Sequence, residues 1–386
     1  MFTIKTLNKI SPLGLEVFPS DFRCADDFEN PDAVMVRSAS MHEMEFPVNL
    51  KAIARAGAGV NNIPIDRCSE LGIAVFNTPG ANANAVKELV LAGLFLSSRK
   101  IVPAIEWSKT LKGEGDNIAK LVEKGKSAFA GPEITGKKLG VIGLGAIGIL
   151  VANAAKNLGM TVYGYDPFLS VDAAWKLSSN IHHAASLKDI YENCDYITVH
   201  VPLTGETRHM IHSESLKLMK NGVRILNFAR GELVCDEDLL EAVRSGKVAC
   251  YVTDFPSDAL IDMENIITIP HLGASTPESE DNCAKMAAME LVDFLKNGNI
   301  KNSVNLPAAS MARGGDTRLT VIHKNVPNMV SQISAALSAG GINIENMLNA
   351  SKKDMAYTMM DVSGDISSAI ADAVRAIDGV IRVTVL

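Results

Sequence analysis

Three glycines and a downstream acid form the most informative pattern of the chain. The glycines follow a short apolar run with the spacing G-x-G-x-x-G: Gly143, Gly145 and Gly148. Between a strand and a helix, such glycines permit a tight turn and close approach of a pyrophosphate, which the N–H groups of Ala146 and Ile147 would hold. Asp166 follows a second apolar run, where it would bind ribose hydroxyls and repel a 2′-phosphate. The pattern predicts a site for NAD rather than NADP.

Three further strings carry side chains suited to a substrate beside the nicotinamide. Arg230, in NFARGE, offers a guanidinium fork that matches a carboxylate. His271, in PHLGAST, could accept a proton during oxidation of an alcohol, and such a histidine needs a carboxylate to orient its ring. TDFPSDALI supplies two candidates, Asp254 and Asp258. The alternatives are a solvated surface arginine and a structural histidine.

These strings are positioned by alternating β-runs and helical segments. The expected strands are 33–36, 50–54, 73–76, 139–142, 161–165, 196–199, 223–227, 248–253 and 266–269. Long helices are expected over 84–97 and 276–297, the second with Pro277 at its first position and Gly298 at its end. This alternation predicts doubly wound parallel sheets of the α/β class, which bind ligands at the carboxyl ends of their strands.

The same pattern predicts the domain organisation. Residues 1–93 and 277–305 are expected to form a substrate-binding domain, and residues 94–276 a Rossmann domain that binds NAD. Residues 306–316, which include Gly314 and Gly315, have the composition of a linker. Residues 317–386 follow the order βαββαβ. The charged segment 112–126 suggests an insertion without an assigned function.

Composition narrows the function classes. The 386 residues carry a formal charge of −7, which disfavours sequence-independent nucleic-acid binding. The six cysteines are scattered, so neither a metal site nor a disulfide framework is expected, and a reducing cytoplasm fits best. The first twenty residues lack the pattern of a signal peptide, and no membrane role is indicated.

The chain resembles the D-isomer-specific 2-hydroxyacid dehydrogenases, in particular members with a C-terminal ACT domain. The resemblance rests on strings that recur in order along the chain: VRSAS, ARAGAGVNNIPID, NTPGANANAVKE, VIGLGAIG, YDP, VHVPLT, NFARGE, PHLGAST and the terminal βαββαβ unit. It implies that Arg230 binds the substrate carboxylate and that His271 transfers the proton. The family glutamate three residues after a phenylalanine corresponds to Asp258, counted from Phe255.

One family position is altered in this chain. The family aspartate that contacts the nicotinamide amide falls on Thr253, next to Asp254. Asp258 is therefore predicted to partner the histidine and Asp254 to contact the nicotinamide. The remaining cofactor positions implied by the resemblance are Thr78, Ala146, Ile147, Asp166, Ala229, Gly273 and Ala274. The implied substrate positions are the amides of Ala58, Gly59 and Val60 for a carboxylate, and Arg37 and Arg55 for a phosphate.

The resemblance also implies an activity and its regulation. The favoured reaction is NAD-dependent oxidation of 3-phospho-D-glycerate to 3-phosphohydroxypyruvate, which opens serine biosynthesis. The alternatives are another D-2-hydroxy acid, such as 2-hydroxyglutarate, lactate or a glyoxylate-derived acid, and a non-catalytic NAD-sensing protein. A dimer or tetramer is expected. His323, Asn325 and Asn343 match positions that bind L-serine, although Asn328 replaces a family glycine; a domain used only for oligomerisation is the alternative.

Overall fold

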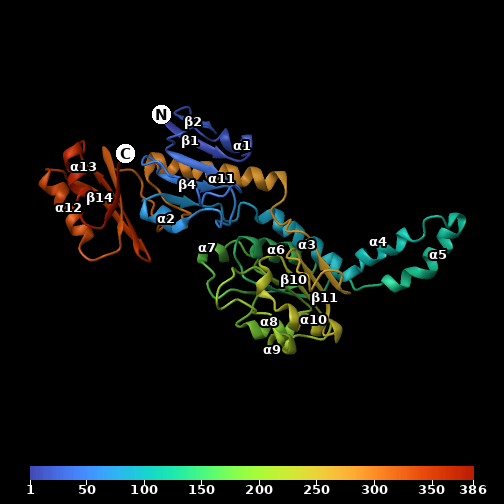
Figure 1. The fold of residues 1–386 in the computed structure, drawn as a ribbon. Helices are drawn as coiled ribbons and strands as arrows, with labels where there is room; N and C mark the ends of the chain where they lie inside the picture. Colours follow the sequence, from blue (N-terminus) through green and yellow to red (C-terminus); the bar gives the residue numbers. More distant parts are fainter. The chain divides into compact units, whose positions relative to one another are not determined.

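The computed structural model describes all 386 residues, which fall into two units (Figure 1). Residues 1–82 and 277–386 form unit 1, and residues 83–276 form unit 2. None of the helices combines the length and the apolar composition needed to cross a membrane.

Unit 1 contains a five-stranded parallel sheet in the order β2-β1-β3-β4-β5. Its strands are β1 (Phe2–Leu7), β2 (Phe22–Ala25), β3 (Ala33–Val36), β4 (Ala52–Arg55) and β5 (Ala74–Phe76). Met35 and Ala54 face a core shared with the helices α1 (Pro12–Leu15) and α11 (Pro277–Asn297). Val34 and Ile53 face the opposite core, with Cys68 of α2 (Ile65–Glu70). Burial on both faces explains why β3, β4 and β5 have nearly continuous apolar sequences.

The C-terminal part of unit 1 is an antiparallel sheet in the order β14-β15-β13-β16. Its elements follow the predicted βαββαβ order: β13 (Thr317–Lys324), α12 (Met329–Ala339), β14 (Ile344–Lys352), β15 (Met355–Val362), α13 (Ser368–Arg375) and β16 (Val380–Val385). Residues of both helices pack in one cluster with Leu319 and Met360 of the sheet. The other face contributes Ile322 and Met359 to the core that contains α11.

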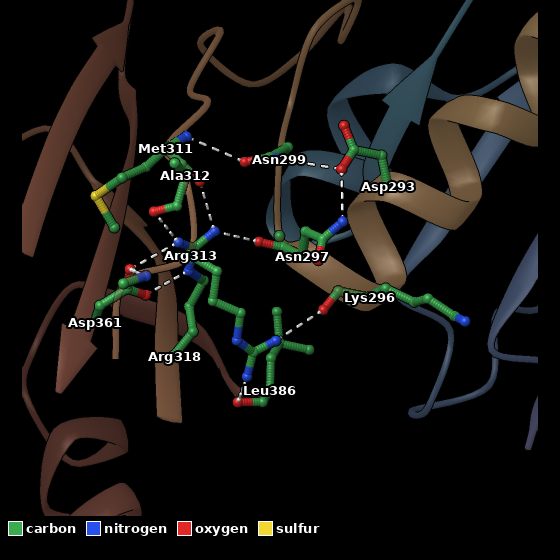
Figure 2. A network of polar contacts seen from close by, with 12 residues as sticks. Asp293, Lys296, Asn297, Asn299, Met311, Ala312, Arg313, Arg318, Asp361 and Leu386 are labelled. Atoms are coloured by element: carbon green, nitrogen blue, oxygen red, sulfur yellow. Dashed lines mark hydrogen bonds and ion pairs between the residues drawn. The ribbon is translucent and has the colours of Figure 1, made fainter. Parts of the chain in front are cut away.

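The last part of the predicted linker, from Met311 to Gly315, is bound to neighbouring residues (Figure 2). The Met311 N–H donates to Asn299 Oδ1 at 3.2 Å, and the Gly314 N–H donates to a carboxylate oxygen of Asp361 on β15 at 2.8 Å. A β-carbon at Gly315 would lie 2.7 Å from the carbonyl oxygen of Val362. The small residues here therefore allow the segment to pack closely against β15.

Unit 2 is built on a seven-stranded parallel sheet in the order β12-β11-β10-β9-β6-β7-β8. The strands are β6 (Lys138–Ile142), β7 (Thr161–Tyr165), β8 (His182–His183), β9 (Tyr196–Val199), β10 (Val223–Asn227), β11 (Val248–Thr253) and β12 (Ile266–Thr268). Two cores lie on its two faces, one containing residues of α3 (Ala83–Arg99) and α6 (Ala146–Asn157). The other contains residues of α8 (Leu187–Asn193), α9 (Ser213–Leu218) and α10 (Asp236–Arg244). The predicted doubly wound class is confirmed, and the strand order reverses at β6, where such folds bind ligands.

The charged segment 112–126 belongs to a helical hairpin. It comprises α4 (Ile101–Lys109), two short 3₁₀ turns and α5 (Ile118–Gly125), and Figure 1 shows it as an arm extending from unit 2. The rings of Trp107 and Phe129 lie 5.3 Å apart and hold the two legs together. The helices α4 and α5 contain no buried residue.

Candidate active site

The glycine turn after β6 has the geometry that a dinucleotide requires. Gly143 has φ +91°, and a β-carbon there would lie 2.6 Å from the His200 carbonyl oxygen. A β-carbon at Gly148 would lie 1.9 Å from the Gly143 carbonyl oxygen. At Gly145, by contrast, a β-carbon would meet nothing within 4 Å. Two glycines therefore form the turn, and the third leaves the space before α6 open for a pyrophosphate.

Asp166 is held beside this turn, directly after β7. One carboxylate oxygen accepts a hydrogen bond from the Leu144 N–H at 2.8 Å, and the other accepts one from the Phe168 N–H at 2.8 Å. Each oxygen keeps a lone pair for a further donor. The chain thus holds an oriented carboxylate at the position where the adenosine ribose is predicted to lie.

The backbone that carries Arg230 is anchored by Asn227, the last residue of β10. Asn227 is fully buried; its amide nitrogen donates to the Arg230 carbonyl oxygen at 2.9 Å and its oxygen accepts from the Ala229 N–H at 3.2 Å. The Arg230 side chain is exposed to solvent. Sequence reasoning named Arg230 and Ala229 but missed Asn227, whose only signal is an amide at the end of a buried apolar run.

Asp254 follows β11 and is 1% exposed. Neither carboxylate oxygen has a hydrogen-bond partner of normal geometry, and a β-carbon at Gly273 would lie 3.4 Å from Oδ2. Burial raises the pKa of Asp254, while the charges of His271 and Arg230 act to lower it. Asp254, His271 and Arg230, all predicted from the sequence, are therefore close enough to act on one another electrostatically. A buried carboxylate such as that of Asp254 needs a hydrogen-bond donor, for example an amide N–H.

His271 and Asp258 are both exposed. The His271 ring packs against the Phe255 ring with centroids 4.8 Å apart, a contact that sequence reasoning missed. No hydrogen bond or ion pair joins His271 to Asp258, so their pairing stays a prediction. Gly273 is buried and Ala274 is exposed in the loop that follows.

Unit 1 holds a loop of unpaired amides after β4. The N–H groups of Ala58, Gly59 and Val60 make no hydrogen bond within the protein. The Thr78 N–H donates to the Gly57 carbonyl at 3.1 Å, and the Asn77 amide donates to the Ala58 carbonyl at 2.6 Å. Because a trans peptide points its N–H opposite to its C=O, these two bonds turn the N–H groups of Ala58 and Gly59 away from residues 77–78. Such a row of free donors suits an anion.

Two arginines add positive charge to this loop. Arg55 lies over it, since a β-carbon at Gly57 would be 2.7 Å from the Arg55 Nη1 atom. Arg55 Nε donates to the Arg37 carbonyl at 3.0 Å, and the pKa of Arg55 is lowered by burial and by the charge of Arg37. Arg37 itself forms an exposed ion pair with Glu280 at 2.5 Å. Thr78 is fully buried, and its hydroxyl has no hydrogen-bond partner.

Comparison with known proteins identifies the family. The family model for the NAD-binding domain of D-isomer specific 2-hydroxyacid dehydrogenases matches residues 93–273. The chain belongs to this dehydrogenase family. It is 35% identical over 328 residues to D-3-phosphoglycerate dehydrogenase of Bacillus subtilis, covering 80% of this chain and 60% of that protein. The enzyme of the same name from Methanocaldococcus jannaschii is 33% identical, over 86% of this chain and 62% of that protein. The chain thus spans about 60% of the length of these two relatives.

A solved structure supports the same family assignment. NAD+-bound 3-phosphoglycerate dehydrogenase of Entamoeba histolytica is similar at 26% identity and TM-score 0.60, over 79% of this chain and 98% of that one. D-mandelate dehydrogenase of Rhodotorula graminis shares the fold at TM-score 0.65 and 22% identity, over 80% of this chain and 99% of that one. The NAD cofactor predicted from the glycine turn is confirmed, because the matching family model is that of an NAD-binding domain and the similar structure has NAD+ bound.

The predicted effector residues have different environments. His323 is 2% exposed, and its ring nitrogens contact the Lys324 carbonyl at 2.8 Å and the Thr358 hydroxyl at 2.9 Å. Asn325 is exposed and donates to the Lys353 carbonyl at 3.0 Å, whereas the exposed side chain of Asn343 makes no hydrogen bond within the protein. Asn328 has φ +69°, a left-handed conformation that explains the glycine found there in the family.

Proposed function

We propose that this dehydrogenase oxidises 3-phospho-D-glycerate to 3-phosphohydroxypyruvate with NAD, the first step of serine biosynthesis. The observation that carries the proposal is the row of free amides at Ala58, Gly59 and Val60 beside Arg37 and Arg55. The substrate has two anionic groups, a carboxylate and a phosphate. Backbone amides bind the carboxylate, and the two guanidinium groups bind the phosphate. The names of the two relatives at 35% and 33% identity support the same substrate.

The residues of unit 2 supply the chemistry of this proposal. NAD, when bound, accepts the hydride from the carbon that bears the substrate hydroxyl. Arg230 binds the substrate carboxylate, and His271 accepts the hydroxyl proton. Asp258 orients the histidine ring, while Asp254 accepts a hydrogen bond from the nicotinamide amide. Ala229, Gly273 and Ala274 complete the cofactor contacts that we propose for unit 2, and Thr78 of unit 1 is a further proposed contact.

A second candidate is a different D-2-hydroxy acid. One observation favours it: Arg37 is already paired with Glu280, so phosphate binding requires that ion pair to open. NADH formation with a panel of phosphorylated and unphosphorylated hydroxy acids tests both candidates. Highest kcat/KM with 3-phospho-D-glycerate supports the first, and preference for an unphosphorylated acid such as lactate or 2-hydroxyglutarate supports the second. NAD binding without turnover of any hydroxy acid would favour a non-catalytic NAD sensor.

Asp166→Ser is expected to narrow the preference for NAD over NADP about tenfold to a hundredfold, since a charge-assisted hydrogen bond is worth roughly 1.5–3 kcal/mol. The substitution also removes the repulsion of a 2′-phosphate. Asp166→Asn is the matched control, because its amide oxygen retains an acceptor for the Leu144 N–H. The measurement is kcat/KM for each cofactor. Equal use of both cofactors by the unmodified protein would contradict the role of Asp166.

We also propose that residues 317–386 form an ACT-like domain in a cytoplasmic homo-oligomer, a dimer or tetramer, that L-serine inhibits. The exposed amides of Asn325 and Asn343 bind the amino acid, and His323 joins them once one of its ring nitrogens leaves its partner in the sheet. Millimolar L-serine is expected to inhibit turnover, and Asn343→Ala to relieve this inhibition. D-serine is the control ligand. If L-serine neither inhibits nor raises the melting temperature, the domain serves oligomerisation only.

A further inference from the structure

A short segment after α11 covers the open edge of β5. The Val304 N–H donates to the Val75 carbonyl at 2.8 Å, and Phe76 forms an antiparallel bridge with Ser303. The buried side chain of Asn305 accepts from the Val75 N–H at 2.9 Å and donates to the Ile73 carbonyl at 2.9 Å. Residues 302–305 thus extend the sheet at the strand that leads into Asn77 and Thr78.

The first residue of this segment connects α11 to the amide loop. Asn302 Nδ2 donates to Glu290 Oε1 on α11 at 2.5 Å, and the Asn302 carbonyl accepts from the Asn77 N–H at 3.3 Å. Asn77 in turn donates its amide to the Ala58 carbonyl at 2.6 Å. Glu290 is 8% exposed, and the hydrogen bond that its Oε1 atom accepts from Asn302 is therefore shielded from water. A continuous series of hydrogen bonds therefore runs from a buried carboxylate to the proposed carboxylate-binding loop.

We propose that Asn77, held by Asn302 and Glu290, is a positioning residue for the substrate carboxylate. Its amide fixes the plane of the peptide between Ala58 and Gly59, and a fixed plane fixes the direction of the Gly59 N–H. A free amide that already points at the anion loses little orientational freedom on binding. This inference rests on the proposed function, because it assigns the loop to the carboxylate of a 2-hydroxy acid.

The arrangement predicts an effect on substrate binding rather than on the cofactor. Asn77→Asp replaces the amide donor with a carboxylate that repels the Ala58 carbonyl and the substrate anion. The expected result is an increase of about tenfold or more in KM for the hydroxy acid, roughly the worth of one oriented hydrogen bond. KM for NAD, and kcat at each pH, stay within about twofold of the wild-type values, because the proposed proton acceptor His271 is unchanged.

Glu290 provides a matched pair of variants. Glu290→Gln keeps an oxygen that accepts from Asn302, whereas Glu290→Leu removes the acceptor and leaves the Asn302 amide without its partner. Glu290→Leu is expected to raise KM for the hydroxy acid severalfold, and Glu290→Gln to retain the wild-type value. Asn305→Ser is the structural control: it weakens the same segment but not the bond to Ala58, so it lowers the melting temperature and leaves KM unchanged.

Steady-state kinetics with the best hydroxy acid of the panel, together with thermal melts, tests the inference. A rise in KM in Asn77→Asp and Glu290→Leu, with rescue in Glu290→Gln, supports it. If both variants only lower the melting temperature, as Asn305→Ser does, the inference is overturned while the dehydrogenase function stands. If the unmodified protein binds NAD but oxidises no hydroxy acid, the proposed function fails and the inference fails with it.

Discussion

Replacement of His271 by alanine is expected to lower turnover by roughly 10²- to 10⁴-fold, the usual contribution of a positioned acid or base. The ring is exposed and packs against the Phe255 ring, so its removal should leave the fold intact. NAD binding, measured by fluorescence titration, should stay near the wild-type value. His183→Ala, at an exposed histidine of β8, is the matched control and should retain full turnover. Turnover of His271→Ala within threefold of wild type would exclude the assignment.

The two neighbouring aspartates sharpen this test. Asp258→Asn is expected to shift the acidic limb of the pH–rate profile, because the proposed orienting carboxylate is lost. Asp254→Asn is expected mainly to weaken NAD binding, because neither oxygen of the buried carboxylate has a hydrogen-bond partner of normal geometry within the protein and the proposed one is the nicotinamide amide. The opposite pattern would exchange their roles, and the charge of His271 near Asp254 makes that outcome physically possible.

The sequence predicts the apolar strands of both parallel sheets and misses β1, β2 and β8. β3, β7, β9, β10 and β11 match the expected ranges, because burial on both faces produces apolar runs. β1 has the sequence FTIKTL and buries only Ile4, so its polar residues interrupt the apolar run that would predict a strand. β8 has two residues, which is too short for a recognisable pattern. The composition of residues 306–316 suggested chain freedom, yet Gly314 and Gly315 pack on β15. Composition alone does not distinguish a flexible segment from one that needs small residues for close packing.

The residues of the candidate site also differ in how well the sequence predicts them. The glycine turn and Asp166 are predictable because their contacts lie within one strand–turn–helix–strand unit. Asn77 and Asn302 are not, because each acts on a residue distant in the sequence and an isolated asparagine carries no periodic signal. The roles of Asp254 and Asp258 depend on where β11 ends and on which carboxylate becomes buried. The sequence does not decide this, because the family aspartate falls on Thr253, one residue before Asp254.

The largest expected effect on stability concerns the buried ion pair of Arg318 and Asp361, shown in Figure 2. Both side chains are fully buried, and the two groups form a fork of two hydrogen bonds at 2.6 and 2.8 Å. The remaining Arg318 donors bind the carbonyls of Asn297, Met311 and Ala312 at 2.8 to 3.0 Å. All five guanidinium N–H groups are therefore used, and they join β13 to the end of α11 and to the linker. A buried pair of this kind is costly to break because the remaining charge stays desolvated.

Asp361→Asn is accordingly expected to lower the free energy of unfolding by about 3–5 kcal/mol, measured by urea titration followed by circular dichroism. Arg375→Ala breaks the exposed pair with Asp372 in the same domain and should cost at most about 1 kcal/mol. Arg318 lowers the pKa of Asp361, so the stabilisation is complete above the ordinary aspartate pKa and is lost as pH falls through the lower folded-state value. The difference in free energy of unfolding between wild type and Asp361→Asn should therefore become smaller at acidic pH. A difference in free energy of unfolding below about 1 kcal/mol at neutral pH would show that the Arg318–Asp361 pair does not hold this domain to the linker.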